Sequence, residues 1–131
     1  MGGTLRTVFA VVVASWFASC GAVGETPARI EVRAPIVRVA VRVAESFPPQ
    51  YFADVKSALP DGCTEFGRFA VRREASMVFV DVFNTRPASS DVACTMLYGE
   101  KEIAVPLGSD FARGATYTLD VNGTREIFTA Q

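Results

Sequence analysis

The strongest constraint on the fold of this 131-residue chain is an alternation of apolar and other side chains with a period of two. Its clearest instance is segment 36–43, which reads Ile-Val-Arg-Val-Ala-Val-Arg-Val. Successive side chains of a β-strand point to opposite faces, so the four valines share one face and Arg38, Ala40 and Arg42 share the other. A helix would need apolar residues three and four apart, so the segment predicts a half-buried strand.

The same alternation recurs between Gly, Pro, Asn and Asp turn signals along the rest of the chain, and no stretch of 12 residues keeps a helical period. Asn122-Gly123 between two apolar runs predicts a type I′ hairpin, because both central positions of that turn need positive φ. We predict seven to nine strands, near residues 29–34, 36–45, 50–57, 64–73, 76–84, 92–98, 101–107, 115–121 and 124–129.

This number of short strands in about 100 residues resembles the architecture of immunoglobulin-like domains. The antibody-type hallmarks are absent, since the single tryptophan, Trp16, lies before the first predicted strand. We therefore expect an all-β fold, an Ig-like antiparallel β-sandwich of no named family.

An uncharged apolar run covers residues 7–19 and is shorter than the roughly 20 residues that a membrane-spanning helix needs. A short apolar run followed by small residues is typical of a secretory signal peptide. The alternative is a buried core element. The boundaries that follow are a signal peptide at 1–19, a tether at 20–28 and a β-sandwich domain at 29–131.

The run ends in Phe17-Ala-Ser-Cys20, which resembles the lipobox of bacterial lipoprotein signal peptides, Leu-(Ala/Ser)-(Gly/Ala)-Cys. Ala18 and Cys20 match, Ser19 is an accepted small residue, and Phe17 replaces the usual Leu. The resemblance implies that Cys20 is lipidated and anchors the mature chain to a membrane of the bacterial cell envelope. The alternative is ordinary cleavage near 22–24, which would release a secreted or periplasmic protein.

The chain has three cysteines, and assigning Cys20 to lipid leaves Cys63 and Cys94 as a pair. An exported chain reaches an oxidising compartment, where small domains form disulfides, so we predict a Cys63–Cys94 bond. The alternative is two buried thiols. A zinc site is disfavoured because the chain has no histidine and such sites use four Cys or His ligands.

The absence of histidine also removes Ser-His-Asp and Cys-His catalysis, and we expect no catalytic residues, metal or cofactor. Glu100 and Glu102 would share one face of a strand, and we favour a solvated strand edge with Lys101 opposite over a role in acid–base chemistry. The 13 basic and 14 acidic residues nearly balance, which argues against a nucleic-acid partner.

Segment 45–52 places aromatic residues around a proline pair, which makes Phe47, Pro48, Pro49 and Tyr51 candidate partner contacts. The alternative is that these rings plug one end of the sandwich. The sequence favours a non-enzymatic, envelope-anchored binding or structural module with a protein or cell-wall partner. The other hypothesis is a secreted or surface protease inhibitor that uses the loops at 48–49, 86–91 and 108–114.

Overall fold

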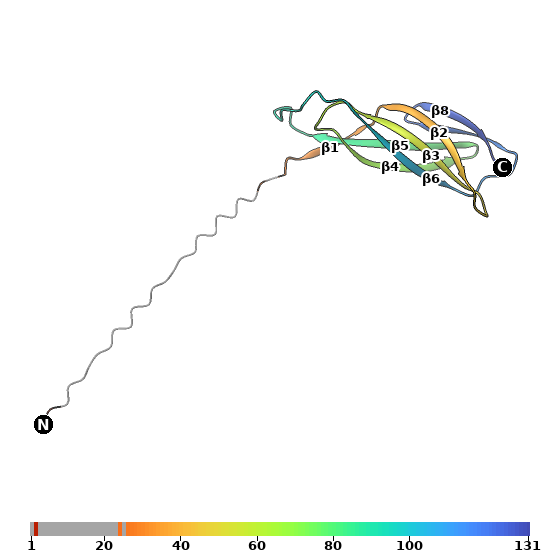
Figure 1. The fold of residues 1–131 in the computed structure, drawn as a ribbon, viewed down its shortest axis with the longest axis horizontal. Helices are drawn as coiled ribbons and strands as arrows, with labels where there is room; N and C mark the ends of the chain where they lie inside the picture. The colour runs from red at the N-terminus through yellow and green to blue at the C-terminus, as the bar shows by residue number, and fades with distance from the viewer. Residues whose placement is uncertain (1, 3–23, 25) are drawn as a thin grey trace.

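The computed structural model describes residues 2, 24 and 26–131, and all of its regular elements in this part are β-strands (Figure 1). The eight strands are β1 (Arg29–Arg33), β2 (Ile36–Ala44), β3 (Gln50–Leu59), β4 (Glu65–Glu74), β5 (Met77–Pro87), β6 (Gly99–Gly108), β7 (Thr116–Val121) and β8 (Thr124–Thr129). The predicted all-β fold is confirmed, with a strand count inside the predicted range. No helix among the described residues is long and apolar enough to cross a membrane.

The strands form a five-stranded and a three-stranded sheet, packed face to face as in the predicted sandwich. The smaller sheet has the order β2-β3-β6, and the larger one is built around β5. One edge of β5 pairs with β4, while β1 and β7 lie end to end along its other edge, and β8 pairs with β7. The β5–β7 pair is parallel, which corrects the expectation of a purely antiparallel sandwich. The reason is that the chain crosses from β6 to the other sheet before it enters β7.

The alternation of side chains along β5 determines which of its residues form the core between the two sheets. Val78, Val80 and Val82 of β5 are buried against residues of the smaller sheet such as Val55 and Val105. The opposite face of β5 carries aromatic rings that arginine side chains from β4 cover, with Arg68 4.4 Å from the Phe83 ring centroid and Arg72 4.1 Å from that of Phe79. In both pairs the guanidinium group lies over the ring face in a cation–π contact, so the aromatic side chains on the outer face of β5 are covered.

Two details of the strand prediction are wrong. Val37 is exposed, because a register shift between Ile36 and Arg38 turns its side chain away from the core. The segment predicted as a strand at 92–98 is part of a loop, 88–98, that pairs with no sheet. A disulfide joins Cys94 in this loop to Cys63, and the next strand begins at Gly99 opposite Leu59.

Four aromatic rings close one end of the sandwich: Tyr51, Phe111, Tyr117 and Phe128. Phe111 lies 4.7 Å from Tyr51 and 4.9 Å from Tyr117 between ring centroids. The Tyr51 hydroxyl accepts a hydrogen bond of 2.9 Å from the backbone N–H of Gln131, which brings the C-terminus to this end. We call this the aromatic end; loops 45–49 and 109–115 leave the sheets there, as the Tyr51–Gly108 pairing shows.

The opposite end holds loops 60–64 and 88–98 and is called the disulfide end. The two ends are separated along the length of β3, which begins at the aromatic end and finishes at Leu59 beside loop 60–64. Figure 1 shows that β1 begins near the disulfide end and that the C-terminus lies at the other.

Candidate functional site at the disulfide end

The predicted partner contacts lie at one end of the sandwich but differ in exposure. Cys20 falls outside the described residues. Phe47 and Pro48 are exposed on the loop between β2 and β3, but Tyr51 is 2% exposed and belongs to the aromatic end. The inclusion of Tyr51 among the partner contacts is therefore wrong, because its side chain points inward from β3 and plugs the sandwich. That leaves Phe47 and Pro48 as the exposed part of this group, and Pro49 beside them is half-buried.

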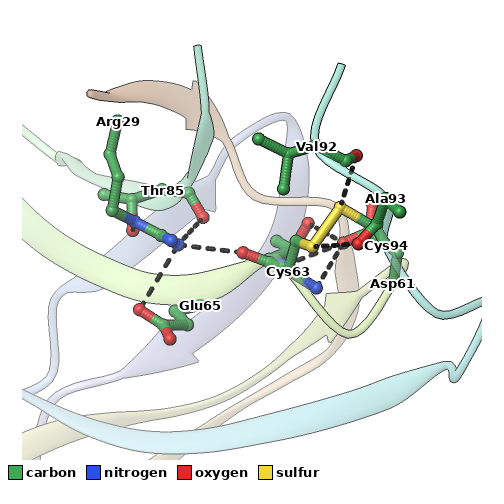
Figure 2. Close-up of a disulfide and its surroundings, with 9 residues drawn as sticks. Arg29, Asp61, Cys63, Glu65, Thr85, Val92, Ala93 and Cys94 are labelled. Carbon is green, nitrogen blue, oxygen red and sulfur yellow. Dashed lines mark hydrogen bonds and ion pairs between the residues drawn. A yellow bond between two sulfur atoms is a disulfide. The ribbon is translucent and has the colours of Figure 1, made fainter. Parts of the chain in front are cut away.

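The predicted Cys63–Cys94 disulfide is present, with 5.4 Å between the two Cα atoms. Both cysteines lie in loops, which corrects the prediction of a strand at 92–98 around Cys94. The bond joins loop 60–64 to loop 88–98 (Figure 2). The Gly62 N–H also donates to the Thr95 carbonyl at 2.9 Å, so two neighbouring connections hold the loops together.

Asp61 organises the turn that presents Cys63. Its Oδ1 accepts hydrogen bonds from the Cys63 N–H at 2.9 Å, the Thr64 N–H at 2.8 Å and the Thr64 hydroxyl at 2.9 Å. The Thr64 hydroxyl contributes most to holding the pKa of the Asp61 carboxyl below its usual value, and the two backbone N–H groups lower it further. This is an Asx-type turn, in which a side-chain oxygen takes backbone donors that would otherwise have no partner.

Asp61, Cys63 and Cys94 also bring three potential metal-ligating atoms within 4.8 Å of one another. The donor chemistry does not suit a metal, since cysteine binds metals as a thiolate and both sulfurs are joined in the disulfide. Oδ1 of Asp61 already accepts three hydrogen bonds. The cluster is a structural one that stabilises the joined loops.

Arg29 connects this end to the point where the chain enters the domain. Its guanidinium donates to the Cys63 carbonyl and the Thr85 carbonyl, both at 2.9 Å, and lies 3.3 Å from the Glu65 carboxylate (Figure 2). One residue earlier, the Ala28 carbonyl accepts a hydrogen bond of 2.8 Å from the Ala88 N–H, at the base of loop 88–98. The chain therefore enters the sandwich beside the disulfide.

Three consecutive apolar side chains stand in solvent on loop 88–98. Met96 is 89% exposed, Leu97 72% and Tyr98 61%. The sequence pattern predicts a strand at 92–98, so these exposed side chains are not expected from it. The run Met96-Leu97-Tyr98 itself argued against a half-buried strand, since three consecutive apolar residues cannot all point to one face of a strand. Contiguous exposed apolar side chains of this kind mark interaction surfaces.

The acidic pair at 100 and 102 is part of a solvated ion-pair network. Lys56 Nζ lies 3.2 Å from Glu100 and 3.0 Å from Glu102, so the neighbouring cation is Lys56 and not the predicted Lys101. Hydrogen bonds with Glu102 and then Glu100 raise the pKa of Lys56. The arrangement favours the structural interpretation of the two glutamates, because each has a paired charge on the next strand.

The three loops considered for protease inhibition are split between the two ends. Loops 48–49 and 108–114 lie at the aromatic end, where Tyr51 pairs with Gly108. Loop 86–91 lies at the disulfide end, where Ala88 bonds to Ala28. A single protease could therefore contact the first two loops together but not all three.

Sequence comparison relates the chain to a protein family and to a protein from another organism. The chain is 29% identical over 91 residues, covering 70% of its own length and 94% of the relative, to a protein of Herpetosiphon aurantiacus named "Uncharacterized 10.2 kDa protein in HgiCIIM 5′ region". No solved structure matches the chain. The model of the ORF11 beta-sandwich domain family matches residues 53–130, from within β3 to one residue before the C-terminus. Because that match covers more than half of the chain, the protein belongs to the ORF11 beta-sandwich domain family.

Proposed function

We propose that this protein is an envelope-anchored bacterial lipoprotein whose β-sandwich is a non-enzymatic binding or structural module. The observation that carries the proposal is the lipobox-like Phe17-Ala-Ser-Cys20. Cys20 stands eight residues before Ala28, where the chain joins the disulfide end. An acylated Cys20 would hold the domain to a membrane by a short tether.

Two physical arguments support this anchor. A single acyl chain binds a membrane only marginally, whereas the two or more chains of a lipoprotein cysteine give stable attachment. Export to an oxidising compartment also accounts for the Cys63–Cys94 disulfide, because structural disulfides are rare where thiols are kept reduced.

The binding role is supported by the exposed side chains on the loops at both ends of a rigid sandwich. Loops held by a rigid scaffold are the usual carriers of recognition. Phe47 is fully exposed on the loop between β2 and β3, next to Pro48. An exposed aromatic side chain of this kind is a typical anchor for a protein partner.

The test of the anchor compares the wild type with Cys20→Ser in a bacterial host. The wild type is expected to fractionate with membranes and to incorporate labelled fatty acid, and Cys20→Ser is expected to abolish both. A Cys63→Ser, Cys94→Ser double variant is the matched control, because it removes two cysteines but should keep the label. Retention of the Cys20→Ser protein in membranes, or a soluble wild type that begins at Glu25, would refute the proposal in favour of ordinary secretion.

A second candidate function is protease inhibition, which the exposed Phe47 favours. An aromatic side chain on a protruding loop is suited to the hydrophobic specificity pocket of a chymotrypsin-type protease. Inhibition by the purified chain, lost in Phe47→Ala and kept in Ile127→Ala, would support it. Ile127 serves as the control because it is also exposed but lies on strand β8. The absence of inhibition at a large excess of the chain over protease would exclude this candidate.

A further inference from the structure

The disulfide end combines two features that no catalytic or metal-binding role explains. It presents Met96, Leu97 and Tyr98 to solvent, and it receives the chain at Ala28 and Arg29. The link between them is short, because Arg29 bonds to the Cys63 carbonyl, Cys63 is joined to Cys94, and Met96 follows Cys94 by two residues. The apolar side chains and the tether therefore share one end of the sandwich.

The length of the tether limits how far this end can lie from an anchored Cys20. Eight residue steps separate Cys20 from Ala28, which span at most about 26–29 Å when fully extended. The disulfide end would thus stay within a few tens of ångströms of the bilayer surface, with the aromatic end farther away.

We propose that the disulfide end rests on the lipid bilayer, with Met96, Leu97 and Tyr98 inserted into its headgroup region. This inference depends on the lipid anchor proposed above and adds the orientation of the domain. Phe47, at the opposite end, then faces away from the membrane toward a partner.

The chemistry of the three side chains fits a bilayer interface. Met96 and Leu97 lose contact with water when they enter it, which is favourable for apolar surface. Tyrosine is enriched at membrane interfaces, where its ring contacts the acyl boundary and its hydroxyl stays hydrated. Three side chains alone would bind weakly, but a tethered domain meets the surface at a high effective concentration, so a weak contact is populated.

The loop is also held in place before contact. The Cys63–Cys94 bond and the hydrogen bond from Gly62 to Thr95 fix its base, which lowers the entropy lost on insertion. The charges at this end are of both signs, as in the Arg29–Glu65 ion pair. The contact should therefore depend little on the charge of the lipid.

Tryptophan fluorescence of the acylated full chain in lipid vesicles tests this orientation. The single native tryptophan, Trp16, lies in the segment that lipoprotein processing would remove, so a processed wild type should lack tryptophan emission. Leu97→Trp and Met96→Trp place a reporter in the proposed contact, at positions that are already exposed. Phe47→Trp is the matched control at the aromatic end. The vesicles are made of phosphatidylcholine, with and without brominated lipid, and in a parallel set with phosphatidylglycerol.

Insertion at headgroup depth predicts a blue-shifted emission from the tryptophans at 96 and 97 and about twofold quenching by brominated lipid. The tryptophan at 47 should be unshifted and unquenched. Vesicle flotation reports the anchor separately. If the chain floats but the tryptophans at 96 and 97 are as unquenched as that at 47, the orientation is wrong and the anchor stands. A blue shift without quenching means that a protein or a second copy covers the loop, which also overturns the proposal. A chain that does not float refutes both the anchor and the orientation.

Discussion

Removal of the disulfide should destabilise the domain through its unfolded state. The bond joins residues 31 apart in sequence, and in the chain-entropy model closing a loop of that length stabilises the fold by about 3.7 kcal/mol. Cys63 and Cys94 lie in loops outside the core, so replacing them with serine should leave core packing unchanged. We expect Cys63→Ser with Cys94→Ser to lower the free energy of unfolding by about this amount and the melting temperature by about 15 °C.

Urea denaturation followed by far-UV circular dichroism measures this change, with Cys20→Ser as the common background so that no other thiol interferes. The double variant should keep the β-sheet spectrum and show a larger urea dependence of the free energy, because its unfolded chain exposes more surface. The wild-type protein, after reduction of its disulfide with dithiothreitol, should unfold like the double variant. A loss below about 1 kcal/mol would refute the reasoning, since it would mean that the unfolded chain gains little freedom from the missing bond.

Three further predictions concern the turns and the core. Asn122→Ala should lower the free energy of unfolding by about 2 kcal/mol, measured by urea denaturation. The reason is that the Asn122 side chain donates to the carbonyls of Ala34 and Val82 and accepts from the Val82 N–H. An unchanged urea midpoint would contradict this prediction. Leu119→Ala should lower the free energy of unfolding by about 2–5 kcal/mol in the same assay, because the buried side chain leaves a cavity when it is removed. A loss near zero would contradict this and would mean that neighbouring side chains fill the cavity. The pKa of Asp61 is lowered in the folded state, so its contribution to stability is present above the unfolded pKa and is lost as the pH falls through the folded value. Asp61→Asn should therefore lose less stability than the wild type between pH 7 and pH 2. Parallel curves of unfolding free energy against pH for the two proteins would count against this prediction.

Much of the fold could be predicted from local patterns in the sequence. The alternation in 36–43 predicts β2, since the side chains of an extended chain alternate whatever the rest of the protein does. Asn122-Gly123 predicts the β7–β8 hairpin, and both residues have the positive φ that its turn requires. The disulfide followed from pairing the two cysteines downstream of residue 20, although the strand predicted around Cys94 was wrong.

The features that local sequence patterns do not predict depend on contacts between distant segments. Val37 leaves the core because of a register shift against β3, and no residue near it in sequence signals that shift. Tyr51 is buried because Phe111 and Phe128 meet it from other strands and loops. Lys56 joins Glu100 and Glu102 because β3 pairs with β6.

The sequence by itself indicated all eight strands, with one extra at 92–98, and it indicated the Asn122-Gly123 turn, the cysteine pair and the apolar run before Cys20. Each of these depends on neighbouring residues or on a simple count. The tertiary structure decided which strands pair, including the parallel β5–β7 pair, and which loops meet at each end. It also decided that Met96, Leu97 and Tyr98 stand exposed beside the point where the chain enters. These outcomes depend on the packing of two sheets and on a bond between residues 31 apart, and local side-chain alternation carries no information about such long-range choices.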